Sequence, residues 1–226
     1  MHPRGEAMET DAESGAINSA PAVRVVLLDF GGVLAEEGFR AGLHAIARLN
    51  GLDPETVHRK GIDTIYESGY VTGTAKEADF WQLMRSRFPF KEADAALTDI
   101  ILDRFTLRPE MIDLVRDLRG RGLTCAILSD QTDWLDRLDR RDDFYREFDR
   151  VYCSYRLGKS KREPILFDEV VADLGVRPGE ALFLDDDPGN VERARSRGLK
   201  ALCCDAATQC RAGLENLLGP GIWRRR

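Results

Sequence analysis

Apolar runs of strand length alternate along this chain with segments whose apolar residues recur at helical spacing. The strand-like runs cover residues 25–28, 125–128, 151–153, 181–184 and 199–203. Apart from Lys200 these runs are apolar, which is typical of strands that are buried on both faces of a parallel sheet. Because helical segments separate these runs, we expect right-handed βαβ crossovers. The predicted fold class is therefore α/β, with a Rossmann-like parallel sheet flanked by helices.

Residues 37–107 break this alternation, because they carry helical patterns and no strand-like run. Pro54 is expected to open one of these helices, since proline favours the first helical turn. Thr74 and Glu77 have the spacing of a capping box, which predicts the start of another helix. The segment is therefore expected to be a helical insertion between the first strand and its partners in the sheet.

The chain is expected to consist of a leader, an α/β core and this helical insertion. The core comprises residues 23–36 and 108–226, and the insertion comprises residues 37–107. Residues 1–22 are small and polar and lack the basic start and apolar centre of a secretory signal, so we expect a disordered leader. A chain of 226 residues is long enough for a core domain with a smaller insert.

The composition is ordinary for a globular protein, with 43% hydrophobic and 32% charged residues. A formal net charge of −6 argues against nucleic acid or a membrane surface as the main partner. No apolar run approaches the roughly 20 residues that a membrane-spanning helix needs. His44 and His58 fall in helical segments and form no evident cluster.

The five cysteines are scattered, and no pair has the spacing of zinc ligands. They are Cys125, Cys153, Cys203, Cys204 and Cys210. We expect them to be reduced thiols in the core of a cytoplasmic protein, because disulfides are rare in that compartment.

Polar residues follow the central strands at one edge of the predicted sheet. Asp29 follows the first strand, and Ser129 and Asp130 follow the second. The acidic residues 185–187 follow a later strand, and Lys161 precedes a helix of the core. Because the carboxyl ends of parallel strands border one crevice, we expect these side chains to converge there.

The carboxylates of this group would repel one another without a cation between them. Mg²⁺ binds to a few carboxylates and carbonyls and keeps some of its waters. Asp29, Asp185 and Asp186 are the candidate metal ligands, and a backbone carbonyl near Gly31 is a fourth. The sequence therefore predicts Mg²⁺ as the cofactor.

A hydroxyl and an ammonium complete a cradle for a phosphoryl group. Ser129 is expected to donate a hydrogen bond to it, and Lys161 to supply a positive charge. Asp29 is then placed to attack phosphorus and form an aspartyl-phosphate. The candidate catalytic residues are thus Asp29, Ser129 and Lys161. The candidate substrate-binding residues are Gly31, Gly32, Ser129, Asp130 and Lys161.

Simpler roles for several of these residues stay open. Ser129 has the residue type of a helix N-cap, and Lys159 competes with Lys161 for the place in the crevice. Asp187, before a proline, is expected to cap the following helix. Asn190 is expected either to orient the acidic loop or to cap it.

Four segments resemble the motifs of the haloacid dehalogenase (HAD) superfamily, over about residues 23–205. Residues 28–34 resemble its first motif, with Asp29 as nucleophile, and residues 127–129 its second, with Ser129 as the phosphate-binding hydroxyl. The segment from Ser154 to Pro164 resembles the third motif, which implies Lys161 as its lysine. Residues 183–186 resemble the acidic metal-binding motif.

The resemblance extends to a subgroup of small phosphatases with a DxG first motif. These include the α-glucose-1-phosphatase type and the N-terminal phosphatase domain of soluble epoxide hydrolases. The helical insertion stands where this subgroup has its C1-type cap, which implies that residues 37–107 close over the substrate.

Two residues depart from the pattern that the resemblance implies. Gly31 stands where most phosphatases of the family carry a second aspartate, which protonates the leaving group and later activates water. Such help is worth about 10²–10⁴-fold in rate. Either another carboxylate replaces it, or the leaving group needs little protonation, or the protein is a weakened member. The candidate replacements are Glu36, Glu37 and Asp130. Arg162, after the motif-three lysine, stands where this subgroup usually has proline.

We therefore predict a cytoplasmic Mg²⁺-dependent phosphatase that hydrolyses a small phosphomonoester, such as a sugar phosphate, through an aspartyl-phosphate. Its expected partner is that substrate, with neither nucleic acid nor membrane, and the sequence does not indicate monomer or homodimer. One alternative is a non-catalytic HAD-fold binding or regulatory protein, which Gly31 keeps open. The other is a 2-haloacid dehalogenase. The acidic pair Asp185 and Asp186 argues against it, because carbon–halogen cleavage needs no Mg²⁺.

Overall fold

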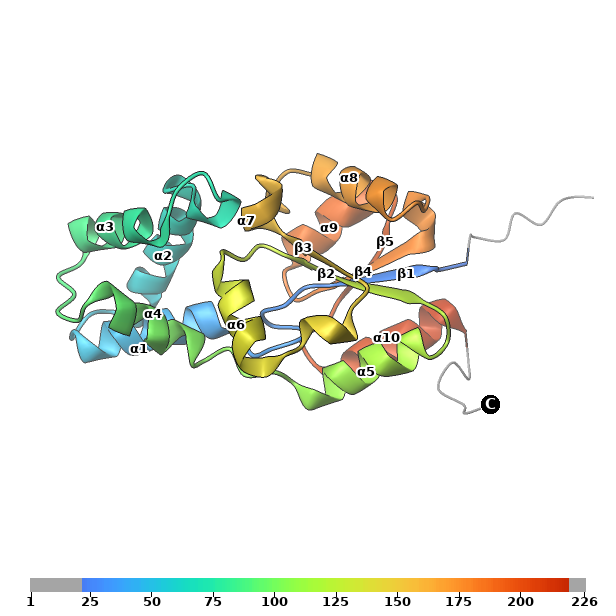
Figure 1. The fold of residues 1–226 in the computed structure, drawn as a ribbon, viewed down its shortest axis with the longest axis horizontal. Helices are drawn as coiled ribbons and strands as arrows, with labels where there is room; N and C mark the ends of the chain where they lie inside the picture. The colour runs from blue at the N-terminus through green and yellow to red at the C-terminus, as the bar shows by residue number, and fades with distance from the viewer. Residues whose placement is uncertain (1–21, 220–226) are drawn as a thin grey trace, which may run out of the picture.

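The computed structural model describes residues 22–219, in which five strands form one parallel sheet. The strand order is β3-β2-β1-β4-β5, so the first strand lies in the centre (Figure 1). The strands are β1 (Val25–Leu28), β2 (Thr124–Ser129), β3 (Arg150–Cys153), β4 (Ala181–Asp185) and β5 (Lys200–Cys203). The prediction of a Rossmann-like α/β fold is confirmed, and the central position of β1 gives its carboxyl end two neighbouring strands.

Alternate residues of β1 pack against helices on opposite faces of the sheet. Val26 and Leu28 join the cluster that includes α5, α6 and α10, whereas Val25 and Leu27 join the cluster of α8 and α9. These helices are α5 (Pro109–Arg119), α6 (Trp134–Asp142), α8 (Ile165–Asp173), α9 (Pro188–Ser196) and α10 (Ala207–Leu218). All four residues of β1 are buried, which explains why the strand is an unbroken apolar run.

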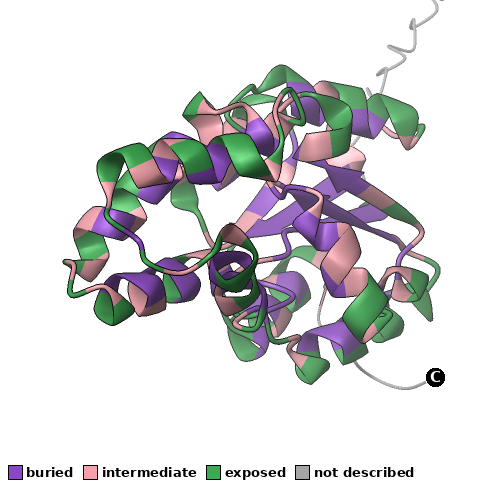
Figure 2. Cartoon of the chain, turned by 60° about the vertical axis from the view of Figure 1, so that its left-hand side comes forward, coloured by how far each residue is buried: buried purple, intermediate pink, exposed green. Residues whose placement is uncertain are grey.

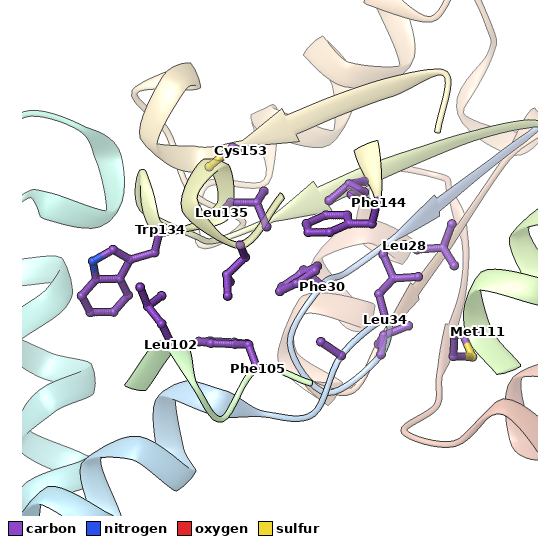
Figure 3. Packing of buried hydrophobic residues seen from close by; sticks show 14 of the residues in the cluster. Leu28, Phe30, Leu34, Leu102, Phe105, Met111, Trp134, Leu135, Phe144 and Cys153 are labelled. Carbon is purple, nitrogen blue, oxygen red and sulfur yellow. The ribbon is translucent and has the colours of Figure 1, made fainter. Parts of the chain in front are cut away.

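An aromatic cluster fixes the chain just after β1 (Figure 3). The Phe30 ring stacks on Phe144 with a centroid distance of 4.9 Å and lies 5.8 Å from Phe105. Phe105 follows α4 (Asp94–Leu102), at the end of the helices that separate β1 from β2. Its contact with Phe30 therefore joins the two ends of this helical segment. Because Leu28 and Phe30 are both wholly buried, Asp29 between them has a fixed backbone.

A block of helices separates β1 from β2, and we call residues 37–107 the helical block. It contains α1 (Gly38–Leu49), α2 (Pro54–Glu67), α3 (Glu77–Arg87) and α4 (Asp94–Leu102). No strand occurs between Gly38 and Leu102, as the sequence predicted. Figure 1 shows this block beside the α/β layers, and Figure 2 shows that its helices are buried on one side and exposed on the other. The strands β1 and β4 are buried at every residue, whereas the edge strands β3 and β5 are partly exposed.

The predicted capping box of Thr74 and Glu77 is wrong. Glu77 is the first residue of α3, and Asp79 accepts a hydrogen bond from the Lys76 backbone N–H at 2.8 Å. Thr74 Oγ1 instead donates to the Gly69 carbonyl, in a turn where Gly69 has a φ of 79°. The Thr74 hydroxyl thus forms a hydrogen bond within the local turn and does not cap the helix.

Two expectations about cysteine and histidine are also wrong. Cys204 and Cys210 form a disulfide, because the start of α10 brings Cys210 back to the end of β5. Cys203 is exposed, and only Cys125 and Cys153 are free thiols within the core, among the described residues. His44 and His58 do meet, with ring centroids 5.6 Å apart, because α1 and α2 pack against each other.

The predicted leader, residues 1–22, falls almost wholly outside the described residues. Between residues 22 and 219, none of the helices combines the length and the apolar character that crossing a membrane requires.

Candidate active site

Asp29 lies at the carboxyl end of the central strand, and its side chain is buried at the floor of a cleft. Its backbone N–H donates to the Leu184 carbonyl at 2.9 Å, which ties it to β4. Lys161 Nζ lies 3.0 Å from Oδ1 of its carboxylate, and the buried Ser129 side chain lines the same cleft from the neighbouring strand β2. Burial raises the pKa of Asp29, and the charge of Lys161 and the hydroxyl of Ser129 oppose that change.

Lys161 bridges two carboxylates from neighbouring strands. Its Nζ lies 2.7 Å from Asp185 Oδ2 as well as 3.0 Å from Asp29 Oδ1. Burial would lower the pKa of Lys161, but Asp185 and Asp29 outweigh it and raise the pKa above its ordinary value. Lys161 therefore stays an ammonium. Its rival Lys159 lies elsewhere and pairs with Glu169 on the surface.

Asp185 has both carboxylate oxygens occupied. Besides Lys161, it accepts hydrogen bonds from the Asp187 backbone N–H at 2.8 Å and from Asn190 Nδ2 at 3.1 and 3.2 Å. The side chain is wholly buried and lies beneath the cleft rather than in its lining. Through these contacts Asp185 holds Lys161 and the loop after β4 in position. Asn190 orients this acidic loop, which was one of its two predicted roles.

Asp187 caps α9, as predicted, by accepting hydrogen bonds from the Gly189 and Asn190 backbone N–H groups at 2.6 and 3.1 Å. The helix begins at Pro188, directly after this cap. The proline belongs to the helix because its missing N–H would have no partner in the first turn. Ser129 is not an N-cap, since the next helix begins at Trp134 with Asp133 at the cap position.

Gly32 lets the acidic loop approach the chain that follows β1. It has a φ of 79°, and a Cβ added there would collide with the Asp186 carboxylate. A side chain at this position would therefore move Asp186 away from Asp29. The second glycine of the motif thus allows two carboxylates from different strands to lie side by side.

Asp29, Asp185 and Asp186 form a group of hard oxygen donors that suits Mg²⁺. One ligand atom from each lies within 4.8 Å of the others. Asp186 is partly buried, and burial raises its pKa, followed by the charge of Asp185. A cation between these carboxylates would remove their mutual repulsion. The donor set fits the metal that the sequence predicted.

Asp130 and Glu36 lie close to this group but are engaged elsewhere. Asp130 accepts from the Lys161 backbone N–H at 2.8 Å and from the Tyr66 hydroxyl at 2.9 Å. Glu36 is exposed and forms a two-pronged ion pair with Arg108, with N–O distances of 2.9 and 3.0 Å. Each oxygen of both carboxylates thus already has a partner within the protein.

The cleft has a volume of about 520 Å³ and lies between the sheet edge and the helical block. The core contributes the predicted residues Asp29, Gly31, Ser129, Asp130, Lys161 and Asp186 to its lining. The helical block contributes Glu37, Phe39, Arg40, His58, Ile62, Ile65, Tyr66 and Val71. Gly32 and Asp185 lie behind this lining. The sequence thus located the core side of the cleft.

Sequence reasoning missed most of the opposite side. Arg40 and His58 line the cleft from α1 and α2 without any motif to mark them. Arg162, noted only as a departure from a proline, places its guanidinium 3.4 Å from the centroid of the Tyr66 ring. The only feature of the sequence that indicated a place for Arg162 near the cleft was its position directly after Lys161.

Several proteins are similar to this chain. D-ribitol-5-phosphate phosphatase of Bacteroides thetaiotaomicron is 24% identical over 189 residues, which cover 79% of this chain and 90% of that protein. Bifunctional epoxide hydrolase 2 of Rattus norvegicus is 28% identical over 116 residues, which cover 48% of this chain. The match spans only 21% of that hydrolase, so this likeness concerns one part of a longer protein.

Solved structures share the fold. A HAD-like family hydrolase from Porphyromonas gingivalis has a TM-score of 0.70 at 25% identity and covers 91% of this chain and 100% of that chain. A HAD family enzyme from Bacteroides thetaiotaomicron, in its magnesium complex, has a TM-score of 0.66 at 22% identity over 81% and 94% of the two chains. A family model of the haloacid dehalogenase-like hydrolases matches residues 23–198. The chain therefore belongs to the haloacid dehalogenase-like hydrolases.

Proposed function

We propose that this chain is a Mg²⁺-dependent phosphatase that hydrolyses a small phosphomonoester through an aspartyl-phosphate on Asp29. The observation that carries the proposal is the Asp29 carboxylate at the floor of the cleft, with Lys161 Nζ 3.0 Å away and the Ser129 side chain in the same lining. A carboxylate, a hydroxyl and an ammonium together suit a phosphoryl group, because one attacks phosphorus and the others bind its oxygens.

In this proposal each core residue has one task. Asp29 attacks phosphorus, and Ser129 and Lys161 hold the transferring oxygens. Asp185 positions Lys161, since it accepts from the ammonium at 2.7 Å and is itself held by the loop after β4. The charged groups of the site are thereby in place before the substrate binds. They need not be reorganised during the reaction, which would cost free energy.

Asp29, Asp186 and the backbone carbonyl of Gly31 are the groups proposed to hold Mg²⁺, with Asp185 supporting them. When bound, the metal would supply positive charge against the carboxylates and the phosphoryl oxygens. The 4.8 Å grouping of the three aspartates supports this assignment.

The helical block is proposed to act as a C1-type cap. It supplies eight of the 22 residues that line the cleft, and closing it over a small substrate would exclude bulk water. Charged and polar groups of this wall, including Arg40, His58 and Tyr66, favour a small polar phosphate such as a sugar phosphate. The name of one relative, D-ribitol-5-phosphate phosphatase, supports that substrate class.

A cytoplasmic location stays a prediction. Its basis was five reduced cysteines, and the Cys204–Cys210 disulfide removes part of that basis.

The test is hydrolysis by the purified protein with Mg²⁺ of a panel of sugar phosphates and p-nitrophenyl phosphate. We expect turnover by the wild-type protein and a loss of about 10⁴-fold or more in Asp29→Asn, as for other nucleophile removals. Equal rates for the two proteins across the panel would contradict the proposal.

The alternative functions give different results. Mg²⁺ with beryllofluoride mimics the aspartyl-phosphate, and we expect it to raise the melting temperature of the wild-type protein and not of Asp29→Asn. A shift without any hydrolysis would favour the binding or regulatory protein. Halide release from 2-haloacids in the presence of EDTA would favour the dehalogenase.

A further inference from the structure

The proposed reaction needs a group that gives and takes a proton. When the bond from phosphorus to an alkyl oxygen breaks, that oxygen leaves as a poor alkoxide unless it is protonated. The water that later attacks the phosphorylated aspartate must lose a proton. Gly31 has no side chain to do either, although it lines the cleft two residues after Asp29.

The three candidate carboxylates for this task are Glu36, Glu37 and Asp130, and the structure argues against two of them. Glu36 points to Arg108 on the surface, and both of its oxygens are engaged there. Asp130 gives one oxygen to the Lys161 backbone and the other to Tyr66. Of these three, only Glu37 has an oxygen that accepts no hydrogen bond from any residue between 22 and 219, and Glu37 lines the cleft.

The position of Glu37 compensates for the absent side chain at Gly31. Glu37 is the N-cap of α1, and its Oε2 accepts the Arg40 backbone N–H at 2.6 Å. This hydrogen bond fixes the carboxyl group and leaves Oε1 facing the core. Oε1 lies 3.8 Å from the point where a Cβ at Gly31 would be. The helical block therefore brings a carboxyl group to the place that the core leaves empty.

The surroundings of Glu37 suit proton transfer near neutral pH. Burial is the largest cause that raises the pKa of Glu37 to about 7, and the charges of Asp186 and Asp29 contribute less, a share that Mg²⁺ bound between them would remove. The Arg40 backbone hydrogen bond and guanidinium, from its own helix, act in the opposite direction. A group whose pKa lies near the working pH can both donate and accept a proton in one cycle.

We propose that Glu37 is the general acid and general base of this active site. The inference rests on the proposed phosphatase function. Asp29 forms a bond to phosphorus while the bond from phosphorus to the leaving oxygen breaks, and that oxygen takes the proton of Glu37 Oε1 and departs as an alcohol. Water then attacks phosphorus and gives a proton to the Glu37 carboxylate. The bond from phosphorus to Asp29 breaks, so that both carboxyl groups return to their initial states and inorganic phosphate leaves.

The test compares Glu37→Gln with the wild-type protein on two leaving groups. Glutamine keeps an oxygen for the Arg40 N–H but carries no acidic proton, so the cap of α1 is preserved. With a sugar phosphate, we expect kcat/KM to fall by about 10²–10⁴-fold. With p-nitrophenyl phosphate, whose leaving group needs no proton, the pre-steady-state burst of nitrophenolate should be retained. Phosphorylated Asp29 should then accumulate, because water lacks its base, and mass spectrometry detects it.

Each outcome has one meaning. If Asp29→Asn is inactive and Glu37→Gln matches the wild-type protein on both substrates, Glu37 has no such role and the phosphatase function stands. An equal loss on both substrates, burst included, would indicate a structural effect and overturn the proposal. Absence of turnover in the wild-type protein would remove the phosphatase function and Glu37 with it. Glu36→Gln, which removes the adjacent carboxylate, is the matched control and should change neither rate.

A second variant tests the place of the proton transfer rather than the residue. Gly31→Asp, added to Glu37→Gln, offers a carboxylate from the core side of the same space. A Cβ at this position would lie 3.3 Å from Phe105 Cε1, so a small shift of that ring admits it. We expect at least tenfold recovery of sugar-phosphate hydrolysis. No recovery in a double variant with an unchanged melting temperature would count against this site of proton transfer.

Discussion

The two walls of the cleft differ in how firmly their side chains are held. On the core wall, Lys161 is 1% exposed, and its Nζ lies 2.7 Å from Asp185, which is 0% exposed behind that wall. On the wall of the helical block, the Arg40 side chain is 55% exposed and its ion pair with Glu55 is 3.4 Å long. The core wall thus keeps one arrangement of charges, whereas the other wall can adjust. This division suits an enzyme whose chemistry is fixed and whose substrate preference is set by the adjustable side.

The helical block itself is not loose, because one end of it is fastened to the core. Glu77 of α3 accepts hydrogen bonds from Trp134 Nε1 at 2.7 Å and from Arg137 Nη1 at 3.0 Å, both on α6. A second contact between the helical block and the core lies beside the cleft. There the Arg162 guanidinium lies over the Tyr66 ring, and the Tyr66 hydroxyl donates a hydrogen bond to Asp130. Movement of the block would therefore change the second contact more than the first.

The largest expected effect concerns the core wall. Lys161→Met removes the ammonium that lies between Asp29 and Asp185 and leaves two buried carboxylates without it. We expect the free energy of unfolding, measured with urea, to fall by about 3–5 kcal/mol. Phosphatase activity should be lost as well.

Lys159→Met is the matched control, because Lys159 pairs with Glu169 on the surface. It should cost about 0–1 kcal/mol. Equal losses for the two lysine variants would show that the core wall is no more firmly organised than the surface.

The core wall could be predicted from the sequence because its residues follow strands directly. Asp29, Ser129 and Asp185 each lie at the end of an apolar run, and parallel strands bring such ends together. The pairing register puts Leu28 beside Leu184, so that Asp29 and Asp185 are level in adjacent strands. Local pattern and sheet geometry were sufficient for this part of the site.

The other wall could not be predicted, because it depends on how helices pack. Arg40 and His58 belong to different helices, and no spacing in the sequence shows that both face the cleft. The choice among Glu36, Glu37 and Asp130 likewise depended on distant partners, namely Arg108 for the first and Tyr66 for the last. Such contacts cross many residues of chain and leave no local pattern.

An intermediate effect is expected where the helical block is fastened to the core. Glu77→Ala would leave the Trp134 indole N–H and the Thr98 hydroxyl without their partner in a mostly buried region. We expect a loss of about 1–3 kcal/mol in the free energy of unfolding. Hydrogen exchange should increase in α3 and α6 while β1 stays protected.

Glu67→Ala is the control for that variant. Glu67 is exposed on α2 and pairs with Arg87 at 2.6 Å, so its loss should cost about 0–1 kcal/mol. An effect of Glu77→Ala no larger than this would mean that the block is not fastened through Glu77.

The smallest effect is expected at the adjustable contact over the cleft. Arg162→Ala removes the guanidinium that lies 3.4 Å from the Tyr66 ring centroid, an interaction worth about 0.5–2 kcal/mol. Because Arg162 also lines the cleft, we expect KM for a sugar phosphate to rise with kcat nearly unchanged. Arg156→Ala is the control, since Arg156 lies 5.7 Å from the Tyr145 ring and outside the cleft lining. A fall in kcat with KM unchanged would place Arg162 with Lys161 in the chemistry of the core wall, and the division between the two walls would then be wrong.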